Sequence, residues 1–369
     1  MKREILISIS SLNSLDVMRL QYAPYWLKFK EPAGTSRGVL KEKVTCFIKV
    51  FDEHDTSRYG IGEAAVFEGL SPEAGGRYEI KLLELVANVA LGRPTDLSCH
   101  SSIQFGLEQA ICDFSSGCEG KYFPSPFIEG KEEIQINGLV WMGDYDKMLE
   151  RLRKKVQEGF RCIKLKIGAI DWEKEVELIR VIRRDYSDRD LMIRVDANGG
   201  FTPEDVMPRL FTLANLGVHS IEQPIQAGNP EAMAAICASS PVPVALDEEL
   251  IGKYTTEDRH KVLENIYPGF IILKPALCGG FTGASEWISL AEELGIGWWV
   301  TSALESNVGL DAIAQWTASI GAKGPQGLGT GGLFTNNFTT PVSLEGDKLR
   351  YNPSAIIDRS QFDSLDWRG

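Results

Sequence analysis

The feature that most constrains the fold is a regular alternation of strand and helix patterns between Ile134 and Ile320. Short apolar segments of strand length alternate with amphipathic segments of helix length, and the connections between them are short. Seven such units fit into about 190 residues, which predicts a parallel sheet covered by helices. This number of units is typical of a closed barrel rather than an open sheet. The predicted strands are 134–141, 162–167, 191–196, 218–222, 242–247, 270–274 and 298–302.

The N-terminal third follows a different pattern, in which strand candidates precede helix candidates. The strand candidates are 44–51 and 58–65, and the helix candidates are 73–91 and 101–115. Strands followed by helices indicate an α+β domain. After Pro341 the sequence predicts one pair of strands that returns to the N-terminal domain. We therefore predict a capping domain at 1–128, with the tail 335–369 packing on it, and a catalytic barrel at 129–334.

Charged residues close four consecutive predicted strands. Asp196, Glu222, Asp247 and Lys274 follow one another at intervals of 26, 25 and 27 residues. The ends of barrel strands meet on one rim, where barrel enzymes build their active sites. One carboxylate at a strand end is as often a helix cap, but three together repel one another unless a cation lies among them. Ligation by oxygen alone favours Mg²⁺, with Mn²⁺ as an alternative, over zinc. We predict the three carboxylates as metal ligands.

The second predicted strand carries two lysines, Lys164 and Lys166, separated by one leucine. Side chains alternate along a strand, so both lysines face the same side. In a closed barrel this side is the interior, where an unpaired charge is costly unless it has a function. The like charge next to Lys166, together with partial burial, favours its free amine, which could act as a base. Lys274 would face it across the opening.

This combination of groups indicates one class of reaction. A carboxylate substrate bound to the metal could lose the proton on its α-carbon to a lysine. The metal would neutralise the enediolate that remains. We therefore expect the partner to be a small-molecule carboxylate.

The same motifs resemble those of the enolase superfamily, over essentially the whole chain. The matching motifs, in order, are Lys164-Leu-Lys166, Asp196-Ala-Asn198, Glu222-Gln-Pro224, Asp247-Glu-Glu249 and Lys274-Pro275. The resemblance implies a TIM-like (β/α)₇β barrel with an α+β capping domain. Within the superfamily, the two-lysine pattern is similar to that of the muconate-lactonizing subgroup. In this superfamily a lysine or histidine base works with Mg²⁺.

Within that subgroup the chain looks most like the o-succinylbenzoate synthase family of menaquinone biosynthesis. The similarity lies in Arg194 and in the segments 301–310 and 327–330. It implies a lyase that removes water, with syn geometry, from a succinylated hydroxycyclohexadiene carboxylate. By resemblance, Lys166 moves the proton and Lys274 stabilises the enediolate. The supporting residues would be Lys164, Arg194 and Asn198, and the substrate contacts Ser302, Ser306 and Asn307.

The same residues are also compatible with other functions. N-acylamino acid racemases share the two lysines, and a non-catalytic binding protein could keep the fold. A dipeptide epimerase is disfavoured because 327–332 has no Asp-x-Asp pair. Ser306 and Asn307 are equally good helix caps. The segment Leu15–Gly38 could close over the barrel mouth with its aromatic and basic residues, Tyr22, Tyr25, Trp26 and Arg37. Tyr22 and Trp26 have helix-like spacing, however, and also fit plain core packing.

Composition excludes several classes of protein. The net charge is −12 and the sequence contains no basic cluster, which argues against nucleic-acid binding. No apolar run approaches the about 18 residues of a membrane span, and 1–8 has no leader pattern. Seven cysteines form no CxxC pair and four histidines are scattered, which favours free thiols in a reducing cytoplasm. We expect a cytoplasmic enzyme, and the sequence leaves its oligomeric state open.

Overall fold

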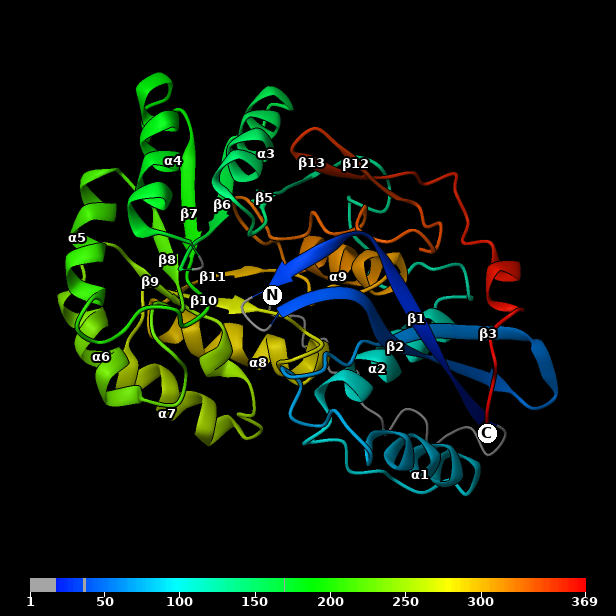
Figure 1. The fold of residues 1–369 in the computed structure, drawn as a ribbon. Coiled ribbons are helices and arrows are strands. Elements are labelled where there is room, and N and C mark those ends of the chain that lie inside the picture. Colours follow the sequence, from blue (N-terminus) through cyan, green and yellow to red (C-terminus); the bar gives the residue numbers. More distant parts are fainter. Residues whose placement is uncertain (1–17, 36–37, 169) are drawn as a thin grey trace.

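The computed structural model describes residues 18–35, 38–168 and 170–369. The prediction that the N-terminus carries no leader falls on residues outside these ranges, as do Leu15 and Arg37 of the suggested cover over the barrel mouth. Figure 1 shows a barrel of strands and helices on one side and a unit of sheet and helices on the other.

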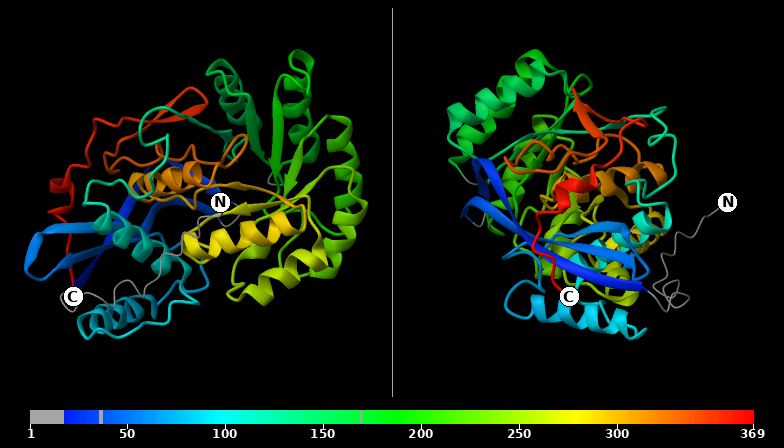
Figure 2. Two further views of the ribbon diagram at one scale, coloured as in Figure 1. Left: turned by 180° about the vertical axis from the view of Figure 1, so that it is seen from behind. Right: turned by 90° about the vertical axis from the view of Figure 1, so that its right-hand side faces the viewer.

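A parallel sheet of seven strands forms the barrel, and a helix follows each strand (Figures 1 and 2). The strands neighbour one another in chain order. They are β5 (Gly138–Val140), β6 (Cys162–Lys166), β7 (Met192–Asp196), β8 (Ser220–Glu222), β9 (Val244–Leu246), β10 (Phe270–Leu273) and β11 (Gly297–Val300). The helices are α3 (Tyr145–Gln157), α4 (Trp172–Asp185), α5 (Val206–Asn215), α6 (Pro230–Ser239), α7 (Thr256–Ile266), α8 (Gly280–Glu293) and α9 (Asn307–Ser319). The predicted alternation of strand and helix is confirmed.

The sheet closes through a short extended segment that follows α9. Gln326 bridges to Ile136 beside β5, and Gly327 bridges to Thr301 just after β11. The backbone N–H of Asn137 donates to the Gln326 carbonyl at 2.9 Å, and that of Gly327 donates to Val300 at 2.8 Å. This segment takes the place of an eighth strand, so the predicted (β/α)₇β architecture is confirmed.

Local sequence explains where the barrel elements begin. Strands covered on both faces are rich in apolar residues, and Ile163, Leu165 and Ile193 are fully buried. Helix α4 is preceded by its N-cap, Asp171, whose carboxylate accepts the backbone N–H of Lys174. Such a cap satisfies a donor that has no partner within the helix. Acidic residues in the first turn also complement the partial positive charge of the helix N-terminus.

The structure divides the predicted strand 134–141 into two parts. Its first part, β4 (Ile134–Gln135), pairs with β13 (Lys348–Tyr351), which forms a hairpin with β12 (Val342–Glu345). Only β5 belongs to the barrel. The C-terminal hairpin therefore extends β4, whereas the last residues of the chain reach the N-terminal sheet. There the backbone N–H of Arg368 donates to the Tyr22 carbonyl at 2.8 Å.

The N-terminal unit is an antiparallel sheet covered by two helices, which confirms its α+β character. Its strands are β1 (Met18–Thr35), β2 (Gly38–Asp52) and β3 (Asp55–Ala64), and its helices are α1 (Tyr78–Ala90) and α2 (Ser101–Ser115). Helix α1 begins five residues after the predicted start, Glu73. The domain boundaries at 128 and 334 stay a prediction.

Strand β1 reaches from this sheet to the barrel (Figure 1). The helix-like spacing of Tyr22 and Trp26 is misleading, because both lie on β1 and alternate side-chain positions of a strand also share a face. Tyr22 is 2% exposed and its hydroxyl donates to Glu79 at 2.9 Å, whereas Trp26 is 49% exposed. Core packing is therefore correct for Tyr22 and wrong for Trp26.

A small apolar cluster joins β1 to the end of the barrel. It consists of Leu27, Phe29, Phe67, Leu304 and Phe334. Tyr25 packs on its edge and its hydroxyl donates to the Asn336 carbonyl at 2.8 Å. On β1, the side chains that pack in this cluster are the apolar Leu27 and Phe29, whereas Lys28 and Lys30 between and after them are exposed. Among the described residues, no helix is long and apolar enough to cross a lipid bilayer.

Candidate active site

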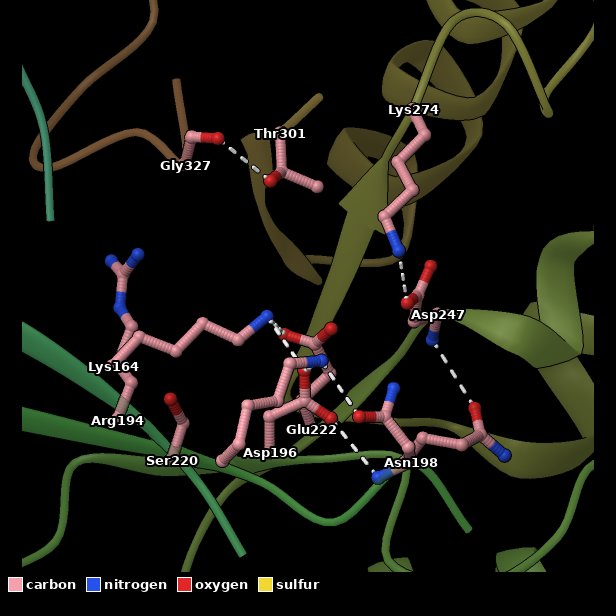
Figure 3. Close-up of polar contacts among 12 residues, drawn as sticks. Lys164, Arg194, Asp196, Asn198, Ser220, Glu222, Asp247, Lys274, Thr301 and Gly327 are labelled. Carbon is pink, nitrogen blue, oxygen red and sulfur yellow. Dashed lines mark hydrogen bonds and ion pairs between the residues drawn. The ribbon is translucent and has the colours of Figure 1, made fainter. Parts of the chain in front are cut away.

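The predicted catalytic side chains lie at the carboxyl ends of adjacent barrel strands. Lys166 is paired in register with Asp196, and Asp196 is paired with Glu222. Asp247 follows β9 and Lys274 follows β10 directly. The parallel sheet therefore brings together charges that lie far apart in the sequence (Figure 3).

Lys164 lies between two of the carboxylates. Its Nζ is 2.5 Å from Oε2 of Glu222 and 2.8 Å from Oδ2 of Asp196. All three side chains are buried. A buried charge is costly unless it is paired and hydrogen-bonded, so the three side chains are stable only as a group.

Lys166 contacts the same aspartate from the next inward position of β6. Its Nζ donates to Oδ2 of Asp196 at 2.5 Å and to Oδ1 of Asn198 at 2.6 Å. Asn198 has a positive φ of 45°, a conformation in which asparagine is enriched, and its backbone N–H donates to Asp196 at 3.0 Å. The Asn198 amide also donates to Glu248 at 3.0 Å. Asn198 thus orients both the lysine and the carboxylate.

Lys274 reaches the acidic group from the opposite side, where its Nζ contacts Oδ2 of Asp247 (Figure 3). Burial lowers the pKa of this lysine, but attraction to Asp247 and Glu222 outweighs burial and holds the pKa above its ordinary value. The Lys274 side chain therefore carries a positive charge at neutral pH. Two lysine side chains, Lys166 and Lys274, thus flank the carboxylates from different strands.

The carboxylates differ in their proton affinity. Burial alone would raise the pKa of Asp196, but the charges of Lys164 and Lys166 hold that pKa far below its ordinary value. Burial and then repulsion from Asp196 raise the pKa of Glu222 to about 8. Burial and the charge of Asp247 raise the pKa of Glu248 as well. The raised pKa values favour the protonated forms of Glu222 and Glu248, because both carboxyl groups are buried next to other negative charges.

These residues have the donor chemistry of a site for a hard divalent cation. Within the described ranges, no three acidic, histidine or cysteine side chains converge as ligands, because lysine ammonium groups lie between the carboxylates. Oε1 of Glu222 is nevertheless buried without a hydrogen-bond partner. A buried, unpaired carboxylate oxygen is costly, and a cation among these side chains would remove that cost. The donor set of Asp196, Glu222 and Asp247 therefore fits Mg²⁺.

A cavity of about 110 Å³ opens beside this cluster. Of the predicted site residues, Lys164, Lys166, Asn198, Lys274 and Ser302 line it. The cavity also has walls that the sequence analysis did not identify. These are Phe67, Leu70, Asn137, Leu139, Trp141, Glu248, Trp299, Thr301, Ala303, Leu304, Gly327, Gly329 and Thr330. Most are apolar residues whose patterns indicated only core packing, and Glu248 was visible as the neighbour of a predicted ligand.

The predicted supporting residue Arg194 lies inside the barrel, next to the cavity wall. Its guanidinium stacks over the ring of Trp299 at 3.9 Å from the centroid and donates to the Pro325 carbonyl at 2.9 Å. Burial lowers the pKa of Arg194. Cation–π stacking of this kind holds an aromatic ring in place. Arg194 supports Trp299 and does not itself line the cavity.

Of the three predicted substrate contacts, one lies at the cavity wall and two lie at the start of α9. Ser302 lines the cavity, and its hydroxyl is 2.6 Å from that of Thr330. Ser306 does not line it: this side chain accepts the Val308 N–H at the start of α9 and donates to Glu63 at 2.6 Å. The backbone N–H of Asn307 donates to the Asn337 side chain, and the Asn307 amide donates to the Phe338 carbonyl. Neither Ser306 nor Asn307 lines this cavity, and the hydrogen bonds of both residues hold the start of α9.

The chain matches the family described as Enolase C-terminal domain-like over residues 147–350. An o-succinylbenzoate synthase of Desulfotalea psychrophila is 44% identical over 90% of this chain and 98% of that protein. The crystal structure of MenC from the same organism superposes with a TM-score of 0.80, at 38% identity, over 90% of this chain and 99% of that one.

More distant relatives have other activities. An N-succinyl-L-Arg/Lys racemase of Bacillus cereus is 26% identical over 63% of this chain and 60% of that protein. A dipeptide epimerase of Cytophaga hutchinsonii, solved with Mg and a dipeptide, has a TM-score of 0.76 at 21% identity over 95% of this chain and 99% of that one. At this identity the superposition establishes the fold alone.

Proposed function

This chain belongs to the enolase superfamily, and we propose that it is a lyase with the activity of an o-succinylbenzoate synthase. In that reaction a succinylated hydroxycyclohexadiene carboxylate loses water and becomes an aromatic succinylbenzoate. The observation that carries the proposal is 44% identity to a relative with this name across nearly the full length of both chains. The arrangement of two lysines and three carboxylates supports it, because it supplies both proton transfer and charge stabilisation.

The proposed metal ligands are Asp196, Glu222 and Asp247, with Mg²⁺ as the ion. Bound there, Mg²⁺ would supply positive charge to the carboxylate of the substrate. The protein side chains then have separate tasks. Lys164 holds Asp196 and Glu222 together through its two short contacts. Asn198 orients Lys166 through the 2.6 Å hydrogen bond to its ammonium group.

Lys166 is the proposed acid and base. In its neutral form it removes the proton from the α-carbon of the substrate, and its Nζ then carries that proton to the departing hydroxyl. The C–H and C–O bonds break, water leaves, and the ring gains the electron pair that makes it aromatic. Both transfers on one face of the ring give syn geometry. Lys274, cationic and on the other side, stabilises the negative charge that develops during the first step.

A racemase of N-succinyl amino acids is the second candidate. The specific observation that favours it is the position of Lys166 and Lys274 on opposite sides of the acidic group, from which two-base chemistry is possible. The Bacillus cereus relative named for this activity covers less of the chain at lower identity. We therefore rank it below the lyase.

One experiment separates the two candidates. Purified protein with Mg²⁺ is assayed for kcat/KM in dehydration of the cyclohexadiene substrate, and for exchange of the α-hydrogen of N-succinyl amino acids in deuterium oxide. We expect dehydration to have the higher kcat/KM by at least about tenfold. A higher kcat/KM for exchange would make the protein a racemase.

A further inference from the structure

The Gly60-Ile61-Gly62-Glu63 motif of β3 brings the capping domain into contact with the cavity wall. Both glycines lie against helix α2: a Cβ at Gly60 would lie 2.0 Å from the carbonyl oxygen of Ala110, and one at Gly62 would lie 1.9 Å from that of Gly106. These distances leave no room for any side chain. The strand therefore packs directly on the helix backbone, which fixes the position of the following residue, Glu63.

Glu63 is fully buried, and its carboxylate caps a helix of the barrel. Oε2 accepts from the Ser306 hydroxyl at 2.6 Å and from the Gly309 N–H at 3.0 Å. Oε1 accepts from the Ser306 N–H at 3.0 Å and from the Thr45 hydroxyl at 2.9 Å. Three of these four donors belong to the start of α9. A carboxylate at a helix N-terminus is favourable because it satisfies free N–H groups and faces the positive end of the helix dipole.

The start of α9 is joined directly to the wall of the cavity. Ala303 and Leu304 line the cavity, and Ser306 follows Leu304 by two residues. Leu304 has a positive φ of 60°, which is strained for a residue with a bulky side chain. The turn is held on its other side by Glu305, whose carboxylate accepts the Ala303 N–H at 2.7 Å. Such a conformation persists only when its surroundings fix it.

A buried lysine accompanies these carboxylates. Burial lowers the pKa of Lys43 on β2, whereas the charges of Glu63 and Glu305 act in the opposite direction. Its Nζ lies 5.9 Å from the centroid of Phe67, another residue of the cavity wall. Lys43 therefore packs against the same wall that Glu63 supports, next to both buried carboxyl groups.

From these contacts we propose that Glu63 is a positioning residue for substrate binding. It holds the start of α9 from the capping domain, so that Ala303 and Leu304 keep the shape of the cavity. The kinetic test of this inference rests on the proposed function, because it measures KM and kcat for dehydration. Glu63 contacts neither the proposed catalytic lysines, Lys166 and Lys274, nor the predicted metal ligands. Its loss therefore affects the fit of the substrate rather than proton transfer.

The test compares Glu63→Gln with Asp113→Asn. Asp113 is the matched control: it is also a fully buried carboxylate of the capping domain, and it accepts the Ile61 and Gly120 N–H groups and pairs with Arg359. None of these partners lines the cavity. In Glu63→Gln an amide NH₂ replaces an acceptor opposite the α9 donors, so we expect KM to rise at least about tenfold with kcat within about threefold. We expect Asp113→Asn to change neither constant.

A second variant keeps the test decisive if Glu63→Gln does not fold. Ser306→Ala removes one donor to the carboxylate and leaves the charge in place, and we expect it to raise KM in the same way by a smaller factor. The double variant should show less than the product of the single effects, because both changes act on one contact. Unchanged KM in a folded Glu63→Gln or in Ser306→Ala overturns the proposal, as does an equal rise in Asp113→Asn.

A readout that needs no substrate separates this inference from the proposed function. Hydrogen exchange of the amides in 303–309 is measured in the wild type, Glu63→Gln and Asp113→Asn. We expect faster exchange in this segment for Glu63→Gln alone. If the wild type does not dehydrate the cyclohexadiene substrate but this pattern appears, the proposed function fails while the positioning role stands. Unchanged exchange in Glu63→Gln contradicts the positioning role whatever the activity.

Discussion

The ammonium group of Lys166 lies 2.5 Å from Oδ2 of Asp196, although the two residues are 30 positions apart in the sequence. This contact joins the proposed acid and base to the proposed metal ligands. Lys164 contacts the same oxygen at 2.8 Å. The two lysines of β6 thus share one carboxylate oxygen, and a change in the charge of Asp196 affects both.

Lys166→Ala is expected to abolish dehydration. The variant retains the cavity and the three carboxylates but lacks the group that moves the proton, so kcat should fall by at least about 10⁴-fold. Absorbance of the aromatic product measures turnover. The control is Lys261→Ala on α7, an exposed lysine paired with Glu257. Turnover of Lys166→Ala within about tenfold of wild type would remove this residue from the mechanism.

Lys274→Ala is expected to lower kcat by about 10²- to 10³-fold. The side chain supplies a positive charge opposite Lys166, and loss of one preformed stabilising group has an effect of this size. Lys274→Arg keeps the charge and should retain more activity than the alanine variant. Steady-state kinetics of the two variants check this order. Equal kcat in both variants would mean that charge is not what Lys274 contributes.

Glu222→Gln is expected to lose the stabilisation that Mg²⁺ gives to the folded protein. A ligand that binds only the folded state raises its stability by about 2.7 kcal/mol at 100 times its Kd. The melting temperature of the wild type should therefore rise with added Mg²⁺, and that of the variant should rise much less. Glu257→Gln, an exposed change on α7, is the control. A full Mg²⁺ shift in Glu222→Gln would show that Glu222 is not a ligand.

Asp311→Asn is expected to flatten the pH dependence of stability. Burial raises the pKa of Asp311 to about 8, and one of its carboxylate oxygens has no hydrogen-bond partner. Between about pH 4 and 8 the folded state keeps a proton that the unfolded state releases, so the free energy of unfolding falls as pH rises. One such group contributes a slope of at most about 1.4 kcal/mol per pH unit.

Urea unfolding of the wild type and Asp311→Asn at several pH values in this window measures the difference. We expect the variant to be the more stable protein above pH 8 and to have the smaller slope. The control is Asp146→Asn, at an exposed position of α3. A slope for Asp311→Asn equal to that of the wild type would assign the pH dependence to other buried carboxyl groups.

The cluster of carboxylates and lysines could be predicted because barrel geometry converts sequence order into spatial order. Asp196, Glu222 and Asp247 each end a predicted strand, and the ends of parallel strands meet on one rim. No tertiary information was needed beyond the strand–helix alternation. The same rule identified Lys166 and Lys274, since one side of each strand must face the interior.

The cavity walls could not be predicted in this way. Trp299 and Phe67 are apolar residues on different domains, and local sequence does not distinguish a cavity wall from a core position. Glu63 and Ser306 are 243 residues apart, so the hydrogen bond that explains both was hidden from any local pattern. Strand β1 was missed for a similar reason, because its pairing with β2 overrides the helix-like spacing of Tyr22 and Trp26.

We propose that this acidic cluster and its two lysines perform magnesium-dependent dehydration. The most direct measurement is the absorbance of the aromatic product after the purified protein is mixed with the cyclohexadiene substrate, with Mg²⁺ and with a chelator. We expect product with Mg²⁺ and none with the chelator. Folded protein that forms no product at saturating Mg²⁺, or forms it equally with the chelator, would contradict it.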